Sequence, residues 1–211
     1  MIKLRMTIVF LALWGVLNGW GQGFGNRELI NVDWYFNFRG ILNMAEPSFF
    51  DHSEWRKLEL PHDWSVESVA SPSLASCTGY LPGGIGWYRK DLDIPKNKEG
   101  NKVYVYFEGV YNNSEVFING KWIGKRPNGY VSFMYDLTPY LNFGGRNVLA
   151  VRVDHSQDAD SRWYTGSGIY RGRLFGLCKS GTYRIVGSEL FGKGESEECC
   201  FICSGGSGEY G

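Results

Sequence analysis

The 211-residue sequence predicts an all-β fold, a β-sandwich, on two observations. Aromatic residues make up 16% of the chain and there are 29 glycines, a composition that favours strands joined by tight turns. Several short segments alternate between apolar and polar residues, and Gly, Asn or Pro separates them. After residue 25, no stretch has the apolar spacing of a helix of three turns.

The first predicted strands cover residues 86–94 and 101–109. Side chains of a strand point alternately to its two faces. In the second of these segments Val103, Val105 and Phe107 therefore share one face, and tyrosines occupy the other. This alternation indicates one apolar face that can turn toward a core.

Residues 114–124 are predicted to form a hairpin. Two apolar strands flank Asn119-Gly120, a dipeptide that suits a type I′ turn because both central residues of that turn have positive φ. The remaining predicted elements are a strand over 130–136, a short turn of helix over 137–141, a loop over 142–145 and a strand over 147–154.

The N-terminus has the layout of a secretory signal peptide. Lys3 and Arg5 precede an almost wholly apolar segment over 6–17, and four glycines follow by residue 25. An uncleaved anchor is the alternative, but the apolar segment is shorter than a membrane span. We therefore expect residues 1–25 to be a signal peptide with a Gly-rich leader. The mature protein is then exported to the periplasm or the extracellular space, with no membrane span.

Charge and motifs exclude several function classes. The 22 basic and 22 acidic residues cancel, which argues against a nucleic-acid-binding protein. The sequence has no P-loop and no dinucleotide fingerprint, so no cofactor is expected. His52 and His155 are isolated in the sequence, and Cys200-x-x-Cys203 has neither a second Cys pair nor a nearby His. No metal site is expected from these residues.

The composition changes after Arg171. Residues 172–211 hold four of the five cysteines and ten glycines, but no Trp, Pro, Asp, Asn or His. Strand alternation and helix caps are both lacking, and residues 204–211 have the composition of a flexible linker. We expect residues 26–171 to form the folded domain and residues 172–211 to form an irregular, disordered tail.

Motifs between residues 34 and 171 resemble the N-terminal sugar-binding domain of glycoside hydrolase family 2, in its β-galactosidase branch. They lie at residues 60–64 (LPHDW), 84–90 (GIGWYRK), 107–110 (FEGV), 115–120 (EVFING), 129–130 (GY), 136–138 (DLT), 147–151 (NVLAV) and 161–171 (SRWYTGSGIYR). The resemblance implies a jelly-roll β-sandwich, galactose-binding-domain-like. Because the likeness stops at Arg171, we expect a truncated or frameshifted gene, with a genuinely divergent tail as the alternative.

The resemblance implies a retaining glycosidase, in which two carboxylates about 5 Å apart act as acid/base and nucleophile. In the family both are glutamates of a barrel beyond this domain, and the acid/base Glu follows an Asn. The sequence contains no Asn-Glu dipeptide. We therefore expect no catalytic residue here and no glycoside hydrolysis by this chain alone. Two alternatives are a free-standing carbohydrate-binding module and a structural domain that docks on a catalytic chain.

Loops of this domain help to shape the sugar pocket in the family. The family's Asn after Gly-Val corresponds to Tyr111, and its acidic position falls nearest to Ser161. Short amides and carboxylates bond sugar hydroxyls, and aromatic rings cover the apolar face of galactose. The candidate sugar-binding residues, for a β-galactoside or a related glycan, are Asn112, Asn113, Asp160, Arg162, Trp163 and Tyr164. The alternative is that Trp163 and Tyr164 pack this loop onto the sandwich.

Other polar residues are expected to stabilise the fold. Adjacent residues of an extended segment point in opposite directions, so His62 and Asp63 are predicted to make fold-stabilising contacts rather than a catalytic pair. Glu108 and Glu115 are predicted to be solvated or to pair across strands. Without a strand after Arg171, the sheet would keep an open edge, which predicts low stability and aggregation.

Overall fold

The structure is a computed structural model that describes residues 27–38, 50–74, 79–156 and 164–171. It also describes the backbone of four strands within residues 173–201. Within this part of the chain the fold is all-β, and three single 3-10 turns are its only helical elements. The turns are η1 (Ser65–Glu67), η3 (Lys96–Lys98) and η4 (Thr138–Tyr140), of which η4 confirms the helical turn predicted over 137–141.

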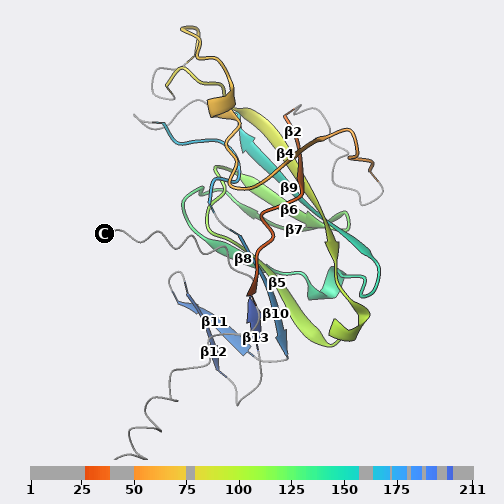
Figure 1. Cartoon of the computed structure of the whole chain (residues 1–211). Coiled ribbons are helices and arrows are strands. Elements are labelled where there is room, and N and C mark those ends of the chain that lie inside the picture. Colours follow the sequence, from red (N-terminus) through yellow and green to blue (C-terminus); the bar gives the residue numbers. More distant parts are fainter. Residues whose placement is uncertain are drawn as a thin grey trace, which may run out of the picture.

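One layer of the sandwich is a six-stranded antiparallel sheet (Figure 1). Its strands, in spatial order, are β3 (Arg56–Leu58), β2 (Trp34–Asn37), β4 (Gly84–Asp93), β9 (Arg146–His155), β6 (Ser114–Ile118) and β7 (Lys121–Arg126). The two ten-residue strands at its centre, β4 and β9, pair along their whole length. They therefore form the rigid middle of this layer.

The second layer contains β5 and four further strands. In order they are β1 (Arg27–Glu28), β10 (Arg173–Lys179), β5 (Asn101–Phe107) and β8 (Phe133–Asp136), with β13 (Cys199–Phe201) also paired to β10. A separate hairpin joins β11 (Thr182–Val186) to β12 (Glu189–Lys193).

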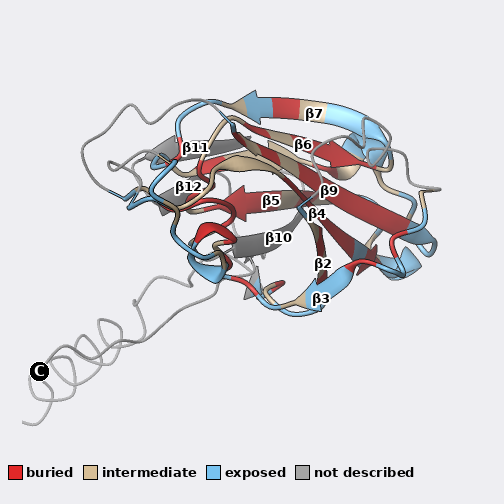
Figure 2. Cartoon of the chain, turned by 90° about the horizontal axis from the view of Figure 1, so that it is seen from above, coloured by how far each residue is buried: buried red, intermediate tan, exposed pale blue. Residues whose placement is uncertain are grey.

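The alternation in the sequence correctly predicts which faces form the core between the layers (Figure 2). Val103, Val105 and Phe107 of β5 are completely buried. On β9, the alternate residues Leu149, Val151 and Val153 face the same core. Each buried aliphatic or aromatic side chain of this kind stabilises a fold by about 1.5–3 kcal/mol through removal of apolar surface from water.

The outer face of the six-stranded sheet carries a second apolar cluster. Trp87, Phe117 and Ala150 form it together with Trp55, which comes from the chain segment before β3. Arg89 lies two residues after Trp87 on β4 and is completely buried. Its Nε donates to Nδ1 of His52 at 3.1 Å. Burial lowers the pKa of Arg89 to about 10. The 50–55 segment therefore covers this face of the sheet.

The predicted Asn119-Gly120 turn is confirmed. Both residues have positive φ, 51° and 77°, and the turn joins β6 to β7. The Asn119 amide also donates to the carbonyl oxygen of Tyr140 and to Oδ1 of Asn147, each at 2.8 Å. The hairpin is thereby tied to the neighbouring loops.

The structure differs from our expectation of an irregular tail after Arg171. Residues 173–179 form β10, which pairs with β5 from Phe107 to Asn101. An unpaired β5 would present a row of free backbone donors and acceptors, and β10 satisfies them. The sheet edge that we expected to stay open is therefore occupied.

Other predictions about the ends of the chain are not tested. The predicted signal peptide, residues 1–25, lies outside the described residues. Within the described part of the chain, no helix has the length and apolar character needed to cross a membrane.

Candidate functional site

Two loops that are distant in sequence meet at one end of the sandwich. Tyr111, after β5, donates its backbone N–H to the carbonyl of Gly168 at 2.9 Å and accepts the N–H of Gly168 at 2.8 Å. This bridge joins the loop that contains Asn112 and Asn113 to the segment of residues 164–171. Three of the predicted sugar-binding residues therefore come from loops that meet here.

Backbone hydrogen bonds fix Asn112 and Asn113. The carbonyl of Asn112 accepts the N–H of Asp154 at 3.1 Å, and the N–H of Asn113 donates to Pro127 at 3.2 Å. Asn113 has a φ of 44°, a conformation that Asn tolerates better than most residues. Oδ1 of Asn112 is buried but has no hydrogen-bond partner within the described chain.

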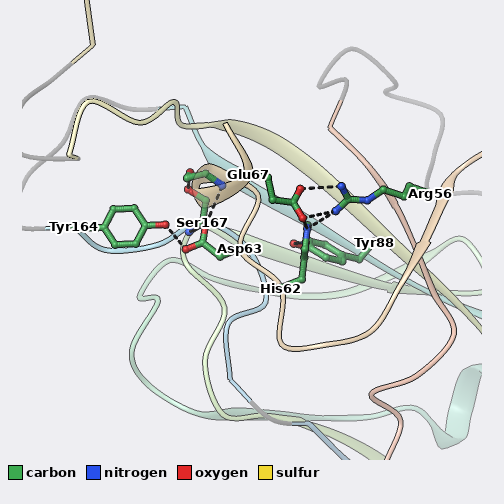
Figure 3. Close-up of polar contacts among 8 residues, drawn as sticks. Arg56, His62, Asp63, Glu67, Tyr88, Tyr164 and Ser167 are labelled. Carbon is green, nitrogen blue, oxygen red and sulfur yellow. Dashed lines mark hydrogen bonds and ion pairs between the residues drawn. The ribbon is translucent and has the colours of Figure 1, made fainter. Parts of the chain in front are cut away.

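Asp63 is the polar anchor of this end of the fold (Figure 3). Its Oδ1 accepts the backbone N–H groups of Ser65 at 3.0 Å and of Ser167 at 2.9 Å. Its Oδ2 accepts the hydroxyl of Tyr164. The backbones around it are also paired, since His62 donates to the carbonyl of Ile169 at 2.9 Å. These contacts support the fold-stabilising role predicted for the LPHDW motif.

Ser167 is completely buried at the centre of a short chain of hydroxyl contacts. Oγ of Ser65 donates to Oγ of Ser167 at 2.5 Å, and Nδ1 of His155 lies 2.6 Å from the same oxygen. A Ser–His pair at this distance resembles a nucleophile with its base. The Ser167 side chain has no exposed surface, however, so the pair joins the end of β9 to the LPHDW motif instead.

The Gly-Ser-Gly sequence of residues 166–168 permits this close approach. Gly168 has a φ of 116°, a region in which side chains are strained. A Cβ there would lie 2.3 Å from the Tyr88 hydroxyl and 2.8 Å from the His62 carbonyl oxygen. Glycine is required at this position for both reasons.

His62 is buried and joins a polar network beside Asp63 whose other members include the half-exposed Arg56 and Glu67 (Figure 3). Nε2 of His62 lies 2.7 Å from Nη2 of Arg56 and 3.2 Å from Oε1 of Glu67, and Nδ1 lies 2.8 Å from the Tyr88 hydroxyl. Glu67 accepts two bonds from Arg56 at 2.8 Å each. Burial lowers the pKa of His62, and the Arg56 hydrogen bond lowers the pKa of Glu67.

Two tyrosines in this region are partly exposed, Tyr164 on the 164–171 segment and Tyr130 on the loop between β7 and β8. Tyr164 is 39% exposed and Tyr130 is 51% exposed. The Tyr130 ring meets Tyr111 edge-on at 5.3 Å, and Tyr111 meets His155 at 5.0 Å. Tyr130 was not among the sugar-binding residues predicted from the sequence. The signal that would have found it is an aromatic residue directly after the turn sequence Asn-Gly.

The other predicted site residues have different outcomes. Asp160, Arg162 and Trp163 lie outside the described residues. Glu115 pairs with Lys125, its cross-strand neighbour, at 3.1 Å, as predicted. Within the described ranges, no group of three or more His, Cys, Asp or Glu side chains is arranged to hold a metal ion.

Comparisons with known proteins identify the family of this fold. The family model described as "Glycosyl hydrolases family 2, sugar binding domain" matches residues 31–185, which extends past Arg171. Beta-galactosidase BoGH2A of Bacteroides ovatus is 50% identical over 163 residues, which are 76% of this chain and 19% of that protein. A putative beta-glucuronidase of Formosa agariphila is 43% identical over 142 residues, 66% of this chain and 14% of that protein.

A solved structure agrees with these relatives. The crystal structure of a beta-glycosidase from Bacteroides vulgatus matches with a TM-score of 0.71 and 47% identity, over 74% of this chain and 20% of that one. The chain thus spans about a fifth of the length of its relatives. By sequence and by fold, the chain belongs to the sugar-binding domain family of the family 2 glycosyl hydrolases.

Proposed function

We propose that this domain forms one wall of a carbohydrate site in an exported glycoside hydrolase that acts on β-galactosides. The wall is the end of the sandwich that carries Asn112, Asn113, Tyr130 and Tyr164, named here the loop end. The observation that carries the proposal is the pair of backbone hydrogen bonds between Tyr111 and Gly168, which joins the loop of Asn112 and Asn113 to the segment of Tyr164.

The chemistry of the loop end suits a sugar. Asn113 is partly exposed, and its amide oxygen can accept a hydrogen bond from a sugar hydroxyl. Tyr130 and Tyr164 offer partly exposed ring faces, and a pyranose has an apolar face that packs on such rings. Sugar sites combine these two kinds of group, a few directed polar atoms and an aromatic platform.

The choice of β-galactosides rests on the Bacteroides ovatus relative, which is a beta-galactosidase. The Formosa agariphila relative is named a putative beta-glucuronidase, so a β-glucuronide is the second candidate. The two sugars differ in the configuration at C4 and in the group at C6, where a uronic acid carries a carboxylate. A direct comparison of the two ligands therefore tests the choice.

The proposal can be tested by saturation-transfer NMR on the full chain. Methyl β-galactoside, methyl β-glucuronide and mannitol are each added to the wild-type chain. We expect transfer to the galactoside, less to the glucuronide and none to mannitol. Tyr164→Ala is expected to reduce the transfer to the galactoside, whereas the control Trp122→Ala, at an exposed aromatic residue on β7, is expected to leave it unchanged. Equal transfer to all three compounds, or none to any, would contradict the proposal.

Export has a test of its own. The basic start, apolar segment and glycines of residues 1–25 support cleavage of a signal peptide near residue 25. N-terminal sequencing of the protein released from a bacterial host is expected to begin close to that residue. A secreted chain that retains Met1 would contradict cleavage.

A further inference from the structure

We propose that Asp63 is a positioning residue of this carbohydrate site: its carboxylate holds the Tyr164 hydroxyl, so that the phenol ring stays in place with one face open to a pyranose. The inference rests on the function proposed above. It adds to that function a residue from the LPHDW motif, which is distant in sequence from every sugar-binding candidate.

Asp63 is itself held rigidly. Its Oδ1 accepts the N–H of Ser65, two residues along the chain, and the N–H of Ser167, on the facing segment. The first of these contacts is the local side-chain bond by which Asp stabilises a turn. The carboxylate is thus fixed from both segments, and Oδ2 remains to receive the phenol (Figure 3).

Tyr164 has the exposure that a stacking residue requires. At 39% exposure, part of its ring is covered and part is open to solvent, while its hydroxyl is bound to Asp63. A ring that is already held before the ligand arrives loses little conformational freedom on binding. The contact therefore pre-organises an aromatic surface instead of merely filling space.

The ionisation of the phenol agrees with this geometry. Burial and the hydrogen bond to Asp63 raise the pKa of Tyr164 above its ordinary value. The hydroxyl thus stays protonated and keeps donating to Asp63 across the physiological range. This property gives a readout that sugar affinity alone would not provide.

Four variants separate positioning from folding. Tyr164→Phe keeps the ring but loses the bond to Asp63, and Tyr164→Leu loses the ring. Asp63→Asn keeps an oxygen for Ser65 and Ser167, and its amide can donate to the phenol oxygen; Asp63→Ala loses all three bonds. Asp33→Asn, at an exposed ion pair with Lys57, is the matched control.

Sugar affinity is measured for each variant by NMR titration with methyl β-galactoside. We expect Asp63→Asn and the control to remain within about twofold of wild type, Tyr164→Phe to weaken binding about fivefold, and Tyr164→Leu to weaken it more. Asp63→Ala is expected to match Tyr164→Phe or to bind more weakly. Thermal melting is recorded in parallel, so that loss of fold is not mistaken for loss of positioning.

A spectrophotometric phenol titration supplies the second readout. The difference between wild type and Tyr164→Phe is expected to show a phenol that ionises above the ordinary tyrosine range near 10. In Asp63→Ala this phenol is expected to ionise at lower pH. Wild-type binding that is unchanged by Tyr164→Phe and Asp63→Ala would overturn the positioning role and leave the proposed function intact. Absence of binding by the wild-type chain itself would overturn both.

Discussion

Tyr111 and Gly168 exchange both of their backbone hydrogen bonds, at 2.9 and 2.8 Å, although β6, β7, β8 and β9 lie between them in the chain. The bridge is an isolated one, outside the two sheets. It closes the loop after β5 onto the segment after β9. It brings the loop of Asn112 and Asn113 next to the segment that carries Tyr164.

Gly168→Ala is expected to destabilise the domain strongly. The new Cβ would meet the Tyr88 hydroxyl at 2.3 Å, and a φ of 116° is unfavourable for alanine. We expect the free energy of unfolding to fall by about 3 kcal/mol or more, because backbone strain and a clash add together. Urea denaturation measures the change.

Gly100→Ala is the matched control for this substitution. Gly100 also has a positive φ, 89°, but a Cβ there has no neighbour within 4 Å. Only backbone strain applies, and a loss of about 1 kcal/mol is expected. Equal losses at the two glycines would show that the close approach to Tyr88 is not important.

Phe107→Ala tests the core between the layers. Phe107 is completely buried and stacks on Phe133 with ring centroids 5.1 Å apart. Removing a buried phenylalanine ring costs about 3–5 kcal/mol, because apolar burial is lost and a cavity remains. Trp122→Ala, on the exposed side of β7, is expected to change the free energy of unfolding by less than about 1 kcal/mol. A smaller loss at Phe107 than at Trp122 would contradict the core described here.

The stability of the fold is expected to fall in mild acid because of His62. Burial lowers the pKa of His62 in the folded state, so the unfolded chain binds the extra proton more readily below the ordinary pKa of 6.5. Stability from this residue is therefore fully present above pH 6.5 and is lost as the pH falls toward the folded pKa. One such proton changes the free energy of unfolding by up to about 1.4 kcal/mol per pH unit.

His62→Gln is expected to flatten this dependence. Glutamine can accept from Arg56 and donate to Tyr88, but it does not titrate. Urea denaturation at pH 7.0, 6.0 and 5.0 compares the variant with wild type. If both chains lose stability equally between pH 6.5 and 5, another group is responsible for the acid sensitivity.

The local patterns of the sequence were enough to predict β4 to β9, but not β2 and β3 of the six-stranded sheet. Val103, Val105 and Phe107 alternate with tyrosines, and Asn119-Gly120 sits between two apolar strands, so the faces and the hairpin follow from short-range rules. Strand β10 was not predicted, because its sequence RLFGLCK lacks alternation and contains a glycine. Its strand conformation comes from pairing with β5, which is a long-range effect.

The candidate site was less predictable for the same reason. The sequence marks Asn112 and Tyr164 as residues suited to sugars, but it does not show that a backbone bridge brings their loops together. Asp63 bonds Tyr164 across 101 positions of the chain, and no local pattern encodes such a contact. The family motifs were enough to select the segments that carry these residues. Only the structure shows which residues of those segments contact one another.

The most direct test of the account maps a bound sugar onto the fold. Methyl β-galactoside is added to the ¹⁵N-labelled full chain, and backbone amide shifts are followed by NMR. We expect the amide shifts of Asn113, Tyr164 and Ser167 to change with sugar concentration, and the amide shift of Trp122 on β7 to change little. Changes confined to β7 and the outer sheet face, or no changes at saturating sugar, would contradict the assignment of the carbohydrate site to the loop end.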